Sequence, residues 1–156
     1  VASHLEKVKN NKELLGPNVI DNVERGLKYS MKDITWAHQE QTKIYNNFRK
    51  FFENYDVLIC PAASVSPFPH EQLFVEEINN EKLPTYMRWL ALSYAPTMAI
   101  PCAWALPCGL DHKNLPFGIQ LIAPAGNDAK LSEIALAIED ALSNYEETKR
   151  AIPDIV

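Results

Sequence analysis

The side chains that could perform nucleophilic chemistry are scattered along the chain. Its cysteines are Cys60, Cys102 and Cys108, and the last of these stands close to Asp111 and His112. A thiol, a base and an orienting carboxylate are the groups that thiol enzymes combine. A reactive thiol also needs an electropositive setting, which a short spacing in sequence does not provide. A structural cysteine beside a surface turn is therefore the favoured interpretation of Cys108, and a thiol site is the alternative.

The other candidate groups lack the partners that their chemistry requires. His70-Glu71 begins like the helix of a zinc protease, but Phe74 occupies the position of the second histidine ligand. Ser64 and Ser66 have no glycine around them that would build an oxyanion hole. The glycines of the chain are isolated, so no phosphate-binding loop is predicted. From its residues alone, the chain shows no metal site and no catalytic constellation.

One apolar segment carries candidates for ligand binding. Arg88 is its only charged residue. The favoured interpretation is a partner carboxylate in the core, and the alternative is contact with the carboxylate or carbonyl of a substrate. Tyr86 and Trp89 are three positions apart and share a helix face. They are expected in the core, with the lining of an aromatic pocket as the alternative.

The elements that must position these residues begin with helices in the first third of the chain. Ser3 with Glu6, and Ser30 with Asp33, fit capping boxes that satisfy free amides at a helix start. Beyond the second pair, apolar residues recur at alternating three and four positions, which predicts one long amphipathic helix. A core seam is expected from Ile34, Ala37, Gln41, Ile44, Phe48, Phe51 and Tyr55.

The remaining chain predicts a small sheet with helices packed on it. The apolar run 57–60 predicts a strand covered on both faces, and 102–106 with 117–123 predict an antiparallel pair. Residues 84–95 are apolar on all sides and predict a buried helix, and a last helix begins after Asn127. The predicted fold class is therefore α/β, a mixed sheet with covering helices.

Length, charge and cysteine usage exclude several classes of protein. The 156 residues suggest one domain, so residues 1–156 are treated as a single region. A net charge of −5 provides no basic surface for nucleic acid or anionic lipid. No apolar run approaches the roughly 20 residues of a membrane helix. Three cysteines without close spacing predict free thiols and a cytoplasmic location.

Four sequence blocks in a fixed order resemble a known family. They are Tyr55-Asp56-Val57-Leu58-Ile59-Cys60-Pro61, the segment from Pro101 to Gly109, the segment from Leu115 to Ile122, and the helix start at Asp128. In these blocks the chain resembles the C-terminal part of the amidase signature family, most firmly from Ile34 to Ala141. It departs from the family pattern at Ile100 and Asn114, where the family often has glycine.

The resemblance implies hydrolysis of C–N amide bonds by a serine nucleophile, without metal or organic cofactor. The family's Ser–cis-Ser–Lys triad and oxyanion loop lie in its N-terminal half, which no stretch of this chain matches. We therefore expect the catalytic N-terminal half to be absent, this chain to be inactive alone, and a small-molecule amide to bind only the intact protein. The resemblance places these candidates on the substrate funnel: Pro61, Ala62, Ala63, Tyr86 and Trp89.

Two hypotheses for the whole chain follow from this resemblance. The leading one is a C-terminal fragment of an amidohydrolase. The alternative is a non-catalytic binding or scaffold domain derived from the same fold. Removal of the N-terminal half would leave strand edges unpaired and apolar surface exposed. The fragment is therefore expected to self-associate, most simply as a homodimer.

Overall fold

The computed structural model of the protein describes residues 1–99 and 101–152. The sequence departure predicted at Ile100 lies outside the described residues. The chain divides into two compact units, Val1–Lys43 and Ile44–Val156, and each is described by itself. None of the described helices is long and apolar enough to cross a bilayer.

The first unit is helical. Its short helices pack around Val23, whose exposed fraction is only 1%. The predicted capping box of Ser3 and Glu6 is wrong: the first helix begins at Leu5 with His4 as its N-cap, so Ser3 stands one position too early. The elements of this unit are α1 (Leu5–Asn10), a 3₁₀ turn (Lys12–Leu14), α2 (Pro17–Gly26) and the first part of α3 (Met31–Phe51).

The start of α3 confirms the second predicted capping box. The carboxylate of Asp33 accepts hydrogen bonds from the hydroxyl and the backbone amide of Ser30, at 2.7 and 2.8 Å. In return, the Ser30 hydroxyl accepts a bond of 3.3 Å from the amide of Asp33. The hydroxyl and then the amide of Ser30 hold the pKa of Asp33 below its ordinary value. These reciprocal bonds fix where the long helix begins.

The apolar seam of α3 is only partly covered. The helix carries no fully buried residue, and Ile34 keeps 44% of its surface exposed. Phe48 and Phe51, near the end of the helix, are half-buried and pack against aromatic neighbours. Periodicity therefore predicted the helix correctly, but the expectation of a buried core seam is wrong, because burial depends on a partner surface that the described residues do not supply.

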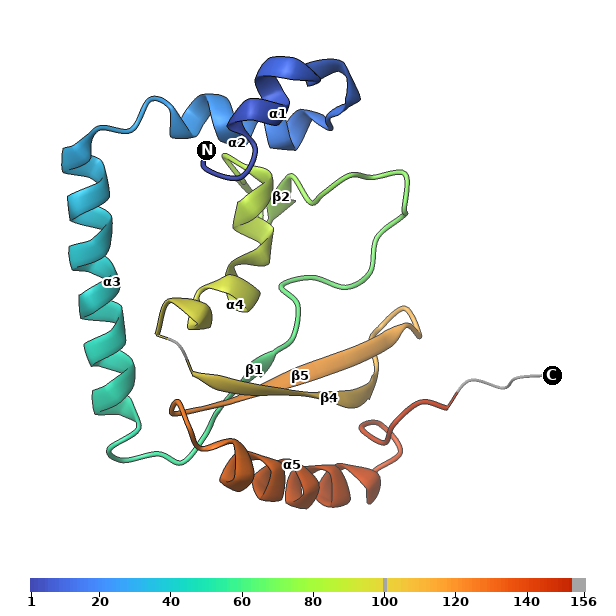
Figure 1. Cartoon of the computed structure of the whole chain (residues 1–156). Helices are drawn as coiled ribbons and strands as arrows, with labels where there is room; N and C mark the ends of the chain where they lie inside the picture. Colours follow the sequence, from blue (N-terminus) through green and yellow to red (C-terminus); the bar gives the residue numbers. More distant parts are fainter. Residues whose placement is uncertain (100, 153–156) are drawn as a thin grey trace. The chain divides into compact units, whose positions relative to one another are not determined.

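The second unit is built on a three-stranded antiparallel sheet with the strand order β1–β5–β4 (Figure 1). The predicted antiparallel pair is confirmed, and its strands run further than expected, as far as the pairing of Leu110 with Pro116. An irregularity in this ladder contains Gly109, whose φ is +68°. The loop between the strands is correspondingly short, and Asn114 adopts a φ of +58° there, a conformation that asparagine tolerates. The strands are β1 (Leu58–Pro61), β4 (Cys102–Leu110) and β5 (Pro116–Ala123).

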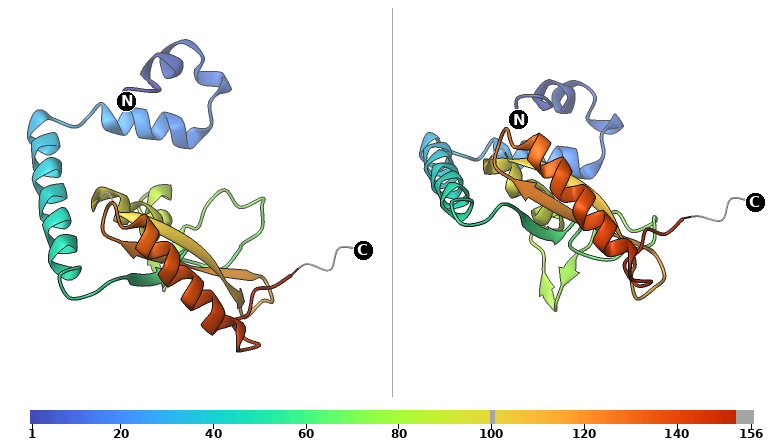
Figure 2. Two further views of the ribbon diagram at one scale, coloured as in Figure 1. Left: turned by 60° about the horizontal axis from the view of Figure 1, so that its bottom comes forward. Right: turned by 90° about the horizontal axis from the view of Figure 1, so that it is seen from below.

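Helix α5 (Asp128–Ser143) lies across one face of this sheet, as Figures 1 and 2 show. The buried core lies between them and consists of Leu106, Leu121, Ala123, Leu131 and Ala135. Strand β1 is at an edge and pairs only with β5 among the described strands, while α5 packs on β4 and β5. Ile59 of β1 consequently keeps 49% of its surface exposed. The prediction of a β1 strand covered on both faces is therefore wrong.

The opposite face of the sheet carries the segment predicted as a buried helix. This segment is instead a 3₁₀ helix, η2 (Tyr86–Leu90), followed by a single α-helical turn, α4 (Ala91–Tyr94). Neither contains a fully buried residue, because only one side of the segment rests on the sheet. A small hairpin of β2 (Glu77–Ile78) and β3 (Glu81–Lys82) projects just before it (Figure 2).

Candidate functional site

A cavity of about 240 Å³ lies beside the end of β1. It brings together three of the five residues that the sequence placed on a substrate funnel, namely Ala62, Ala63 and Trp89. Ser66, from the loop that follows β1, and Gly118 of β5 also line it. Residues from segments far apart in the sequence therefore meet at one hollow of the second unit.

The other two predicted residues lie near this cavity without lining it. Pro61 ends β1, and its carbonyl oxygen accepts a hydrogen bond of 3.2 Å from the side chain of Gln120. Tyr86 packs instead against Phe74, with their ring centroids 6.2 Å apart. The spacing of Tyr86 and Trp89 does not bring both rings to this cavity wall.

A polar side chain in the middle of β5 positions the cavity. The Nε2 atom of Gln120 donates to the carbonyl oxygens of Pro61 and Leu92, at 3.2 and 2.8 Å, and so connects β1 and α4 across β5. The amide of Ala62 adds a bond of 2.9 Å to the carbonyl of Gly118. Sequence analysis overlooked Gln120, although a lone polar residue within an apolar strand is a signal of a buried hydrogen bond.

Aromatic rings form one side of the cavity. Phe68 meets Trp89 edge to face, with centroids 5.5 Å apart and an interplanar angle of 81°. Such geometry is favourable because the positive edge of one ring faces the negative face of the other. The Nε1 atom of Trp89 is buried and has no hydrogen-bond partner in the described part of the chain. The remaining lining residues are Val65, Pro67, Pro116 and Phe117.

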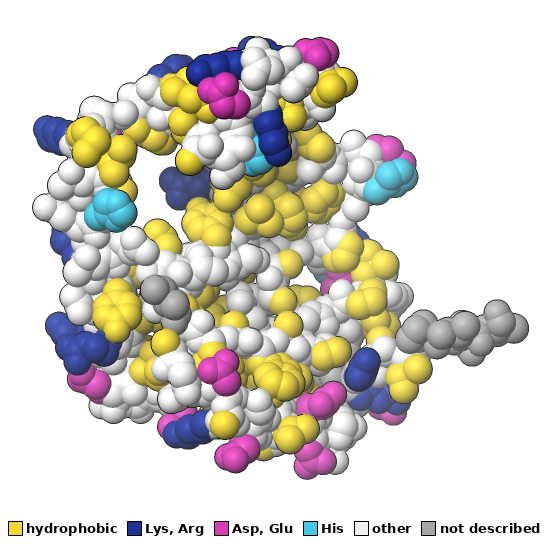
Figure 3. Space-filling view, viewed as in Figure 1, with side chains coloured by type: hydrophobic (Ala, Val, Ile, Leu, Met, Phe, Trp, Pro, Cys, Tyr) yellow, Lys and Arg dark blue, Asp and Glu magenta, His cyan; other side chains and the backbone are white. Residues whose placement is uncertain are grey.

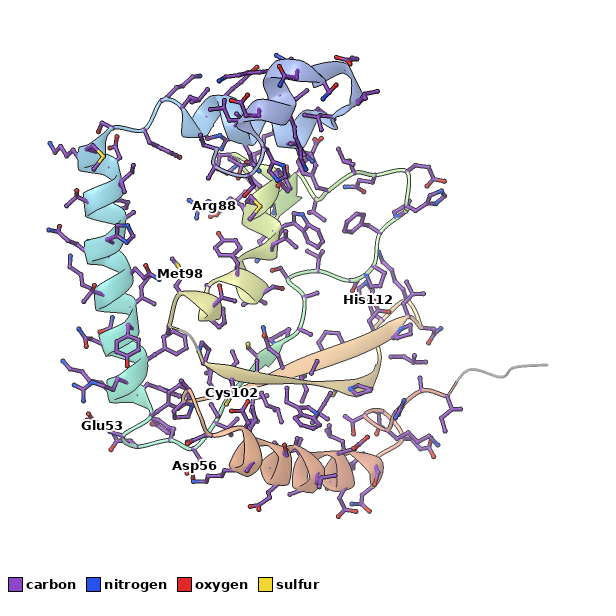
Figure 4. The ribbon with its side chains drawn as sticks, in the orientation of Figure 1. Glu53, Asp56, Arg88, Met98, Cys102 and His112 are labelled. Atoms are coloured by element: carbon purple, nitrogen blue, oxygen red, sulfur yellow. The ribbon has the colours of Figure 1, made fainter. Side chains whose placement is uncertain are left out.

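Asp111 organises the hairpin loop next to the cavity. Its Oδ1 atom accepts backbone hydrogen bonds from Leu115 and Lys113, at 3.0 and 2.8 Å. The Leu115 amide, followed by the Ser66 hydroxyl, holds the pKa of this carboxyl below its ordinary value. The Oδ2 atom is buried without a hydrogen-bond partner among the described residues, so Ser66 acts on it from a longer distance. His112 lies at the end of the same hairpin, as Figure 4 shows.

The three cysteines are free, as predicted. Burial raises the pKa of the Cys60 thiol, and the hydrogen bond from Gln120 only partly opposes it. Cys102 donates to the carbonyl oxygen of Pro124, at 3.2 Å. Near Cys108, the carboxylate that a thiol site would require is already bonded to the amides of its own loop. These contacts favour structural thiols over a nucleophilic one.

The remaining candidates are on the surface. Arg88 projects outward from η2 (Figure 4), and no carboxylate of the described residues lies within ion-pair distance of it. Its interpretation as half of a core ion pair is therefore wrong. The side chain of His70 is 93% exposed, and its Nδ1 atom lies 3.2 Å from Glu71. Among the described residues, no group of three His, Cys, Asp or Glu side chains is arranged to hold a metal ion.

Comparison with known proteins identifies the family. The family model described as Amidase matches residues 5–131, which is more than half of the chain. The chain belongs to the amidase family. A curated relative from Streptomyces avermitilis, the A-type subunit of its glutamyl-tRNA(Gln) amidotransferase, is 34% identical over 106 residues. That match covers 67% of this chain and 20% of the relative, so the chain spans about a fifth of the length of the curated relatives it matches.

Solved amidase structures share the fold. A crystal structure of an amidase matches with a TM-score of 0.76 and 21% identity, over 88% of this chain and 31% of the other. A bacterial aryl acylamidase of the amidase signature family matches with a TM-score of 0.77 and 18% identity, over 89% of this chain and 29% of the other. These likenesses confirm the predicted mixed sheet with covering helices.

Proposed function

We propose that these residues form the C-terminal part of an amidohydrolase that cleaves C–N amide bonds with a serine nucleophile. The observation that carries this proposal is the amidase family match over residues 5–131. The resemblance puts the Ser–cis-Ser–Lys triad in a region that nothing in this sequence matches. The chain is accordingly proposed to supply fold and substrate contacts, and to hydrolyse no amide by itself.

The proposed contribution of this chain is one wall of the substrate funnel. Ala62, Ala63 and Trp89 are the residues for which the cavity beside β1 gives support. Pro61 and Tyr86 complete the proposal as neighbours that border the same segments. The partner of the intact enzyme is then a small-molecule amide, and its chemistry requires no metal and no organic cofactor.

A non-catalytic binding or scaffold domain is the second candidate. It is favoured by one observation: the sheet and α5 enclose a buried core without help from any other chain. A domain with its own core could persist after losing its catalytic partner. The two candidates differ in what they predict for the surface that is left exposed.

The proposed location is the cytoplasm, and the proposed state of the isolated chain is self-associated, most simply a homodimer. Three free thiols support a reducing compartment. Two sheet edges without a partner strand among the described residues support association, because the free backbone groups of an edge can pair with another chain.

Activity measurements on the purified chain test the catalytic part of the proposal. We expect no release of product from simple amides or esters above the buffer background. A nucleophile, its base and oxyanion donors together supply most of the rate enhancement in acyl transfer, and the chain lacks this combination. Turnover that persists through rigorous purification and disappears in Ser64→Ala, Ser66→Ala or Cys108→Ala would contradict the proposal.

A longer version of the protein provides the matching positive experiment. Extension of the reading frame upstream should reveal a lysine followed by a glycine-rich Ser-Ser segment. The extended enzyme should hydrolyse amides and lose that activity when the lysine is replaced. An upstream sequence without these residues would favour the scaffold domain instead.

A further inference from the structure

The cavity beside β1 has a chemical character that membership of the amidase family does not specify. No ionisable side chain lines it in the part of the chain that the structure describes, and Ser66 contributes the one hydroxyl. Aromatic and proline rings make up half of its wall. A ligand group that enters it must therefore be uncharged, because a charge would lose its hydration without gaining a counter-charge.

The size of the cavity suits an aromatic ring. An apolar protein cavity of roughly 150 Å³ is large enough to take up benzene. The volume of about 240 Å³ here leaves room for a ring and a small attached group. Phe68 and Trp89 already meet edge to face, and a third ring can join them in the same kind of contact.

Trp89 supplies a hydrogen-bond donor that has no acceptor among the described residues. A buried indole N–H normally finds a partner, and an unpaired one is unfavourable. The Nε1 atom of Trp89 is in this position, and its residue forms part of the cavity wall. A small turn of the indole would present this N–H to a ligand oxygen inside the cavity.

We propose that this cavity binds the ring of an uncharged aromatic amide, whose carbonyl oxygen accepts a hydrogen bond from Trp89. The identification of the ligand as an amide rests on the proposed function, whereas the ring and the absence of charge come from the cavity itself. The Asp111 carboxylate, adjacent to Ser66, further disfavours an anionic ligand. An amino-acid amide such as glutamine finds no counter-charge here for its carboxylate.

Ligand-observed NMR with the 156-residue chain tests this specificity directly. Benzamide is the probe, with acetamide as the ligand that lacks the ring and benzoate as the ligand that carries a charge. We expect benzamide to bind at least tenfold more tightly than either. Ala63→Leu, which fills the cavity, should weaken benzamide binding at least tenfold. Ala129→Leu is the matched control on the exposed side of α5 and should leave binding unchanged.

A second variant examines the hydrogen bond and guards against misfolding of the first. Trp89→Phe keeps an aromatic ring and removes the N–H, so benzamide binding should fall about fivefold, the value of one typical hydrogen bond. Circular dichroism should show that both variants remain folded. If Ala63→Leu does not fold, the response of Trp89→Phe decides.

Three results would overturn the inference: no binding of benzamide, equal binding of benzoate or acetamide, or unchanged binding in the variants. The measurement reports binding rather than turnover. Such a failure therefore removes the aromatic specificity and leaves amide hydrolysis by the longer enzyme untouched. Loss of that hydrolysis is detected separately, by the activity of the extended chain.

Discussion

At the scale of single residues, Gly109 is required for two independent reasons. Its φ of +68° lies in the left-handed region, which costs an L-residue roughly 1–2 kcal/mol. A Cβ atom at this position would also overlap the backbone carbonyl of Glu147, from the segment after α5. The irregularity in β4 therefore allows the chain beyond α5 to fold closely against the sheet.

Substitution of Gly109 should reveal this close contact. We expect Gly109→Ala to lower the free energy of unfolding by about 2–4 kcal/mol, since both the backbone angle and the overlap oppose the methyl group. Gly126→Ala is the matched control: its φ is +81°, but no atom lies within 4 Å of its Cβ position. Urea midpoints measure both variants. Equal losses would mean that the contact with Glu147 contributes nothing.

Asp111 gives a prediction for the pH dependence of stability. Because its pKa is lowered in the folded chain, its contribution is present above its ordinary value of 3.8 and is lost as the pH falls through the folded value. Asp111→Asn should therefore lose less stability than the wild type between about pH 5 and 3. Urea unfolding at several pH values measures this, with Glu133→Gln as a control for net charge. Parallel curves for Asp111→Asn and the wild type would contradict it.

At the scale of elements, local patterns and tertiary surroundings differ in how far sequence can predict them. The start of α3, the β4–β5 pair and α5 were predictable, because capping residues and apolar periodicity are local signals. The burial of Ile34 and of the segment 86–94 was not, because it depends on which surfaces pack against them. Two prolines border that segment and keep its helices short.

The revised burial of α3 changes what truncation should cost. Phe48 is half-buried and borders two cavities, so Phe48→Ala should lower the free energy of unfolding by only about 1–2 kcal/mol. Lys43 is exposed and pairs with Glu40 at 2.6 Å, and Lys43→Ala should cost a few tenths of a kcal/mol. Chemical denaturation measures both. A loss of about 3 kcal/mol or more at Phe48 would indicate a covered seam, and equal midpoints would place the packed face elsewhere.

At the scale of the whole molecule, the site was predictable only through family resemblance. Ala62, Ala63 and Trp89 carry no catalytic signal of their own, and their spacing does not predict that they meet. Their meeting depends on Gln120, whose two hydrogen bonds join segments that lie 28 and 59 positions away in the sequence. A single sequence contains no periodicity that reports contacts over such separations.

The exposed margins of the sheet determine how the isolated chain should behave in solution. Ile59, Leu121 and Trp104 form one row across the three strands. Leu121 is fully buried under α5, whereas Ile59 and Trp104 at the two edges keep 49% and 42% of their surface exposed. Figure 3 shows further apolar side chains at the surface around η2 and α4. Apolar edges with unpaired backbone groups favour pairing with a second copy.

Light scattering coupled to size exclusion should therefore report a mass near twice the 17.7 kDa of one chain at micromolar protein. Ile59→Lys should shift the chain toward the monomer, because a charge at a sheet edge opposes strand pairing. Leu14→Lys removes an exposed apolar side chain that is not on this sheet and serves as the control. A hydrophobic dye should bind the monomeric variant more strongly than the dimer. A wild-type chain that is a monodisperse monomer and binds no dye would show that it closes its own core, and the scaffold domain would then become the better description.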